Sequence, residues 1–147
     1  MSKTISYKGT IVIGEQEQIR LKTNNGKTGY KITKFQLFPN TPHAVDSALI
    51  GQIFKTDQTG SITATVNFTD SDLLGVATFE DKSSSLYTTH ENIVFDNEKF
   101  NQDIFITMTD ADGNTTPGNY YIELETMALT DIEATMLTLQ SIRQVMS

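Results

Sequence analysis

The segment DADGN places three potential metal ligands at alternate positions, Asp110, Asp112 and Asn114. Carboxylate and amide oxygens in this pattern are the first three ligands of an EF-hand calcium loop. That loop also requires glycine at its sixth position and a bidentate glutamate at its twelfth, where this chain has Thr115 and Tyr121. The segment is therefore interpreted as an Asp-Gly turn between two strands, and no calcium site is expected.

Histidine is the next residue type that could bind a metal or act as a base, and the chain has two, His43 and His90. Both fall in segments expected to be loops. His90 precedes Glu91, but neighbouring residues on an extended chain point to opposite sides and cannot share one ion. No H-E-x-x-H pair occurs. Both histidines are interpreted as structural or solvent-exposed.

Carboxylates flank the segment LLGVATF on both sides, at Asp70, Asp72, Glu80 and Asp81. A glycosidase needs two carboxylates that face each other across a cleft, and spacing in sequence does not establish this. NFTDSD is interpreted as a turn in which aspartates bond their own backbone. The chain has no cysteine, G-x-S-x-G elbow, P-loop or dinucleotide fingerprint. We expect no enzymatic activity, no metal and no cofactor.

The composition indicates one globular domain over residues 1–147, with 37% hydrophobic and 20% charged residues. A formal net charge of −7 disfavours nucleic-acid binding, which depends on neutralising phosphates. No apolar run approaches the roughly 20 residues that span a bilayer, so no membrane partner is expected. MSKTISYKGT lacks an apolar stretch, and no signal peptide is expected.

The basic residues are unevenly distributed along the chain. Seven of the 11 lie within the first 34 residues, and only Lys82, Lys99 and Arg143 follow Lys55. This polarity either orients docking on an acidic partner or reflects solvated strand faces.

Most of the chain has the alternating pattern and the β-branched and aromatic content of half-buried strands. The predicted strands are 3–13, 17–23, 28–38, 48–56, 61–69, 73–79, 91–96, 102–110 and 119–129. A change of face near Thr33 or Lys34 predicts a β-bulge. Asn25-Gly26 and the Asp-Gly pair at 112–113 predict tight hairpins. The fold is predicted to be all-β with one helix: an antiparallel β-sandwich of the jelly-roll or immunoglobulin-like kind over 1–128.

The segment 129–146 has a helical pattern instead. Thr130 and Glu133 form a T-x-x-E capping box at its start. Two apolar edges are predicted, the first formed by Leu129, Ile132, Met136, Leu139 and Met146, and the second by Leu137, Ile142 and Val145. A helix this short is marginal alone, so it must pack on its own domain or on another subunit. These eight residues are the predicted interaction site.

Several stretches of the chain, namely KTISYKGT, GYKITKFQLFPNTP, FDNEKFNQDIFIT, NYYIELE and LTLQSIR, resemble a small structural protein of marine tailed bacteriophages. The likeness extends nearly end to end. It implies a virion structural component without catalytic residues. A short, acidic, cysteine-free β-domain also resembles capsid decoration (cement) proteins, which stabilise the outer shell.

The resemblance implies synthesis in the host cytoplasm and a final location on the outer capsid surface. The implied partners are the major capsid protein, copies of the same chain, or both, in a homo-oligomer on the particle. One alternative is a neck or tail component. A second is a host-attachment or carbohydrate-binding module, which would need exposed aromatic side chains on a concave face.

Overall fold

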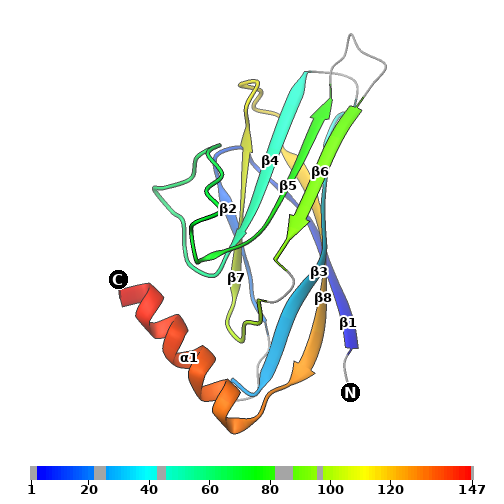
Figure 1. Ribbon diagram of the computed structural model, residues 1–147. Coiled ribbons are helices and arrows are strands. Elements are labelled where there is room, and N and C mark those ends of the chain that lie inside the picture. Colours follow the sequence, from blue (N-terminus) through cyan, green and yellow to red (C-terminus); the bar gives the residue numbers. More distant parts are fainter. Residues whose placement is uncertain (1–2, 22–25, 43–45, 82–87, 96–97, 147) are drawn as a thin grey trace.

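The structure is a computed structural model that describes residues 3–21, 26–42, 46–81, 88–95 and 98–146. Two antiparallel sheets pack as a sandwich, and one C-terminal helix follows, which confirms the predicted fold class (Figure 1). The three-stranded sheet has the order β1 (Lys3–Ile11), β8 (Gly118–Ala128), β3 (Thr28–Pro39). The five-stranded sheet has the order β2 (Gln16–Ile19), β7 (Ile104–Asp110), β4 (Ser47–Phe54), β5 (Leu73–Asp81), β6 (Thr88–Val94). The helix is α1 (Asp131–Met146).

The core lies between the sheets and is formed by every second residue of the strands. In β8 the inward positions Tyr120, Ile122 and Leu124 are buried, and the residues between them are only half-buried. The same alternation in β3 and β7 adds Ile32, Phe35, Leu37, Ile104, Ile106 and Met108. Full burial of such a side chain contributes about 1.5–3 kcal/mol, so this layer is the main source of stability.

Both predicted hairpins are wrong, because the strands on either side of each turn belong to different sheets. β2 pairs with β7 while β3 pairs with β8, so the connection through Gly26 crosses the sandwich. β7 and β8, on either side of Gly113, are likewise in separate sheets. The turn chemistry itself is present, since the two glycines have φ of +74° and +77°. Positive φ sets a sharp local bend but does not decide whether the flanking strands pair.

The predicted strand at 61–69 is also wrong. This segment belongs to an irregular connection between β4 and β5. Its polar side chains bond the neighbouring backbone, as where the Asn67 Oδ1 accepts from the Thr69 amide at 3.0 Å. The Asp70 carboxylate accepts from the Asp72 amide at 2.9 Å, which confirms the turn predicted there. Such local bonds compete with sheet ladders, and here they prevail over the β propensity of threonine.

Of the other local predictions, some are confirmed and others are wrong. The bulge is confirmed by a register shift between Ile32 and Lys34 opposite β8. His90 was expected in a loop but lies in β6, where it pairs with Phe79 of β5. His43 lies outside the described residues. The described part of the chain has eight strands, fewer than the nine segments predicted.

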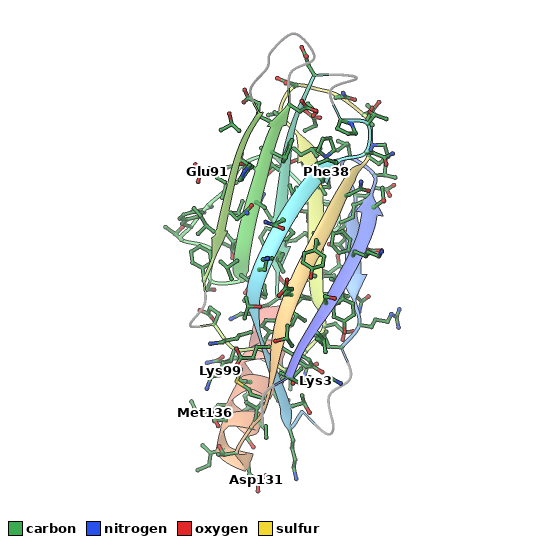
Figure 2. The ribbon with its side chains drawn as sticks, turned by 90° about the vertical axis from the view of Figure 1, so that its right-hand side faces the viewer. Lys3, Phe38, Glu91, Lys99, Asp131 and Met136 are labelled. Atoms are coloured by element: carbon green, nitrogen blue, oxygen red, sulfur yellow. The ribbon has the colours of Figure 1, made fainter. Side chains whose placement is uncertain are left out.

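The two sheets differ in width, and this difference shapes one side of the molecule. Viewed from the three-stranded side, β5 and β6 extend beyond β3, the edge strand of the narrower sheet (Figure 2). The inward face of β6 is therefore only partly covered. The Asn92 side-chain amide takes the orientation in which both its oxygen and its nitrogen have hydrogen-bond partners. In this orientation it donates to the Phe35 carbonyl at 3.3 Å and so links β6 to the edge of β3.

Candidate interaction surfaces

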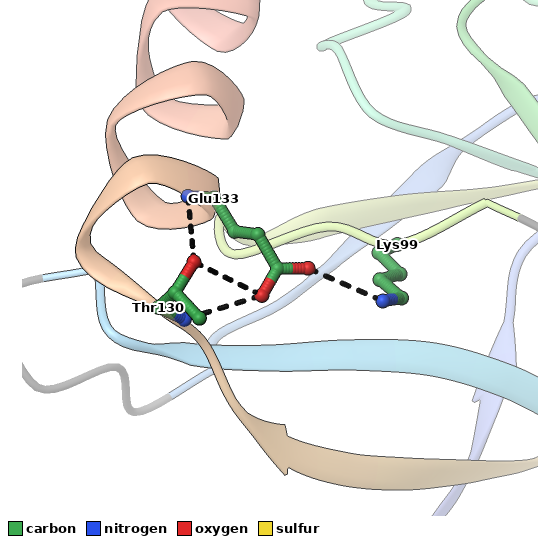
Figure 3. A network of polar contacts seen from close by, with 3 residues as sticks. All are labelled: Lys99, Thr130 and Glu133. Carbon is green, nitrogen blue, oxygen red and sulfur yellow. Dashed lines mark hydrogen bonds and ion pairs between the residues drawn. The ribbon is translucent and has the colours of Figure 1, made fainter.

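The start of α1 is fixed by the predicted capping box, which is confirmed (Figure 3). The Glu133 amide donates to Thr130 Oγ1 at 3.2 Å, and the Thr130 amide donates to Glu133 Oε1 at 3.2 Å. Lys99 Nζ lies 3.3 Å from the other carboxylate oxygen, Oε2. The backbone hydrogen bond from Thr130, followed by the contact with Lys99, holds the pKa of Glu133 below its ordinary value of 4.5. The ionised carboxylate therefore links the helix start to the chain segment before β7.

The depressed pKa of Glu133 predicts a pH-dependent contribution to stability. A carboxyl whose pKa is lower when folded stabilises the fold fully above its unfolded pKa, and this stabilisation is lost as pH falls through the folded value. Glutamine can also close the capping box but carries no charge. We expect the wild type to have a higher melting temperature than Glu133→Gln at pH 7, and the difference to shrink as the pH is lowered from 7 to 3. Melting curves of both proteins across this range check it. A difference that is equal at both pH values would contradict the assigned role of the charge.

The link between β8 and α1 is packed tightly against β3. The Leu129 amide donates to the Lys27 carbonyl at 2.8 Å, and the Leu129 side chain is buried. A Cβ placed on Gly29 would lie only 2.6 Å from Leu129 Cδ2, so a side chain there would displace the leucine. Glycine at 29 is therefore needed for this approach.

Asn101 makes a second connection between the helix and the sandwich. Its side chain is buried, and Nδ2 donates to the Gly26 carbonyl at 2.9 Å and to Thr138 Oγ1 at 3.1 Å. Ala134, one turn before Thr138, is also buried. The N-terminal half of α1 is thus attached to its own domain by buried apolar and polar contacts.

The opposite side of α1 is uncovered. Four apolar side chains, which we call the exposed stripe, are 73%, 55%, 48% and 49% exposed: Ile132, Met136, Leu139 and Ile142. All four belong to the predicted interaction site, and Figure 2 shows Met136 pointing away from the strands. Exposed apolar residues that are contiguous, and not scattered singly, typically mark an interaction site.

The grouping of the eight predicted residues differs from the expected two edges. Leu129 precedes the helix and is buried, so it does not continue the edge of Ile132. Leu137 is half-buried and Ile142 is exposed. At about 100° per residue these two positions lie about 140° apart around the axis and cannot share an edge. The side chains of Val145 and Met146 lie outside the described part of the structure.

The uneven distribution of charge along the sequence does not become a basic face. Lys8 and Lys34 lie on the outer face of the three-stranded sheet, on β1 and β3. β8 lies between these strands and places Glu123 and Glu125 on the same face. Lys34 Nζ is 3.7 Å from the Glu123 carboxylate. Because the last strand is inserted between the first and third, acidic and basic side chains alternate there.

Sequence reasoning missed a groove of about 660 Å³ where the overhanging β5 and β6 meet the outer face of the three-stranded sheet. Its wall is aromatic. The Phe38 and Phe79 rings meet edge-on with centroids 5.7 Å apart, and the His90 ring stacks on Phe79 at 6.2 Å and 16°. Phe38 is 53% exposed although it lies in a strand.

The floor of the groove is polar and crosses all three strands in two rows. One row is Lys8, Tyr121 and Gln36, and the next is Thr10, Asn119 and Phe38. The Tyr121 hydroxyl donates to Glu123 Oε2 at 2.9 Å, and this bond raises the pKa of the phenol. Strict alternation along KTISYKGT would have placed Lys8 and Thr10 on one face of β1. Strict alternation along KFQLF would have placed Gln36 and Phe38 on one face of β3. The pairing of β5 with β6, and its position beside β3, was not visible in the sequence.

The carboxylates singled out in the sequence take part in turns or lie at opposite ends of one strand. Asp110 accepts from the Ala48 amide at 3.1 Å and the Asp112 amide at 2.8 Å, which confirms the Asp-Gly turn. Asp72 directly precedes β5 and Asp81 ends it, so the two lie about 30 Å apart at the usual rise per residue. Among the described residues, no three His, Asp or Glu side chains lie close enough to hold a metal ion.

Comparison with known proteins does not assign this chain to a family. No protein-family model matches it, and no curated protein is significantly similar in sequence. Within the described residues, no helix is long and apolar enough to cross a bilayer.

Proposed function

We propose that this chain is a non-enzymatic structural protein of a phage virion, and specifically a capsid decoration protein that stabilises the outer shell. The segment-level resemblance to phage structural proteins supports the proposal. One structural observation carries it furthest: α1 is attached to its own domain on one side and presents the exposed stripe on the other. That arrangement suits a helix that is held in place by its own stable domain and contacts another subunit.

In this role the exposed stripe contacts the major capsid protein or a neighbouring copy of the same chain. A protein that binds only the assembled lattice stabilises that lattice by mass action. The net charge of −7 suits a position on the outside of the shell, away from packaged DNA. Repetition of one modest contact over a symmetric shell supplies the overall stabilisation.

The same stripe would also serve a neck or tail component, which is the alternative function. The two roles differ in number, because decoration requires hundreds of copies per particle and a neck ring about a dozen.

Copy number therefore tests the proposal. We expect quantitative mass spectrometry of purified virions of the encoding phage to find hundreds of copies per particle, and cryo-EM to place them on the shell. About a dozen copies at the neck or tail would overturn decoration in favour of the alternative. Absence from the particle would overturn a structural role in the virion altogether.

A further inference from the structure

We propose that the groove between β3 and the overhanging β5 and β6 binds a saccharide. This site is separate from the exposed stripe and does not depend on the proposed virion role. It is assigned from the chemistry of its two surfaces, which differ in a way that few ligand classes match.

The aromatic wall matches the apolar face of a sugar ring. A ring face carries negative potential and attracts the C–H bonds that a pyranose presents on one side. Phe38 offers this face because it projects from the edge strand β3 with half of its surface in solvent. Its edge-on contact with Phe79 and the stacking of His90 on Phe79 hold the three rings as one unit. Such a wall is preorganised, so little side-chain entropy is lost on binding.

The floor matches sugar hydroxyl groups, each of which both donates and accepts hydrogen bonds. Side-chain amides offer both functions from one group. Gln36 has an exposed side chain that lines the groove, so its amide is able both to donate to and to accept from a sugar hydroxyl. Asn119 accepts from Thr10 Oγ1 at 2.6 Å, which orients its amide and leaves Nδ2 able to donate. These amides lie on neighbouring strands, where rigid backbone fixes their spacing.

The size and charge of the groove restrict the class of ligand further. The groove volume of about 660 Å³ is within the range of small-molecule binding sites. The described residues that line the groove include no carboxylate, and Lys8 is their one permanent cation. Acidic saccharides are therefore accepted despite the net charge of the chain, and we expect a carboxylate on the sugar to face Lys8.

The test uses an array of oligosaccharides that includes oligomers of neutral hexoses and oligomers of hexuronic acids, followed by calorimetry on the ligands that bind. We expect binding by the whole chain, at least about tenfold weaker in Phe38→Ala and in Gln36→Ala. Phe68→Ala is the matched control, because Phe68 is 55% exposed and lies outside the groove. Its affinity should equal that of the wild type.

Two results would overturn the saccharide site: no binding to any oligomer at millimolar concentration, or binding that neither groove variant weakens. Melting curves of each variant show whether the fold is intact. A variant with the exposed stripe replaced should bind the sugar normally, so failure of the shell-binding role and failure of the groove remain distinguishable.

Discussion

Replacing the exposed stripe by glutamine at all four positions is expected to abolish attachment to the particle while the β-sandwich keeps its stability. Burying the exposed part of each side chain contributes about 1 kcal/mol, so the four together contribute about 4 kcal/mol. Since each 1.4 kcal/mol is tenfold in affinity, the loss should be at least about 100-fold. Glutamine forms helix as readily as isoleucine or better, so α1 itself should persist.

The measurement is co-sedimentation with shells that lack the protein, together with sedimentation equilibrium of the free chain to detect self-association. The matched control replaces Gln140, an exposed polar residue of the same helix that lies beside the stripe and not within it, by another polar residue. It should bind as the wild type does. Wild-type affinity in the stripe variant would refute the contact role of α1, and a lowered melting temperature would show that the stripe supports the fold instead.

Phe35→Ala is expected to destabilise the protein more than Gly51→Ala or Phe38→Ala does. Phe35 is 1% exposed and lies between the sheets. Removing a buried phenylalanine ring costs about 3–5 kcal/mol because the cavity collapses only in part. In a domain of this size that lowers the melting temperature by about 10 °C. Urea unfolding monitored by fluorescence or circular dichroism measures the free energy directly. Phe38→Ala, on the outer face of the same strand, should cost less than about 1 kcal/mol.

A second substitution tests the reason for that loss. Gly51 of β4 faces Phe35, and a Cβ there would lie 3.0 Å from Phe35 Cζ and 2.9 Å from Leu37 Cδ2. Gly51→Ala should therefore destabilise the wild type by about 1–3 kcal/mol through overpacking. In the Phe35→Ala background the added methyl group fills part of the cavity, so the same change should cost less or stabilise. Additive effects of the two changes would show that Phe35 and Gly51 do not share this space.

Local chemistry was read correctly from the sequence wherever one short segment decides the outcome. The capping box of Thr130 and Glu133, the bulge near Lys34 and the turn after Asp110 all depend on residues within a few positions. The class of fold was also predictable, because alternation identifies strands and their spacing implies a sandwich.

What the sequence did not reveal depends on pairing between distant strands. The turns at Gly26 and Gly113 have the same sequence signature whether the two strands they connect pair with each other or lie in different sheets. The groove could not be predicted for the same reason, since Phe38 and His90 join one cluster around Phe79 only because β5 and β6 lie beside β3. On the helix, the apolar residues were identified correctly, but which of them the domain covers was set by Gly29 and Asn101, far away in sequence.

The strand order also sets when this protein can fold during its synthesis. β8 is the central strand of the three-stranded sheet, and its partners β1 and β3 precede it along the chain. The pair that joins Pro39 of β3 to Gly118 spans a shorter interval than the closest pair of β1 with β8, which joins Ile11 to Gly118. At ordinary translation rates the ribosome needs about 5–20 s to cover that interval. During this time β1 and β3 have no sheet partner, so their apolar faces are open to chaperones or to wrong pairing.

The same order of synthesis has a consequence for the docking role that we propose. α1 follows β8 directly, so it emerges after the strand that completes the sheet. A nascent chain that presents the stripe has therefore already made every strand of the sandwich. Under the proposed function, incomplete chains would lack the surface that attaches, and the order of synthesis would keep unfinished copies out of the assembly.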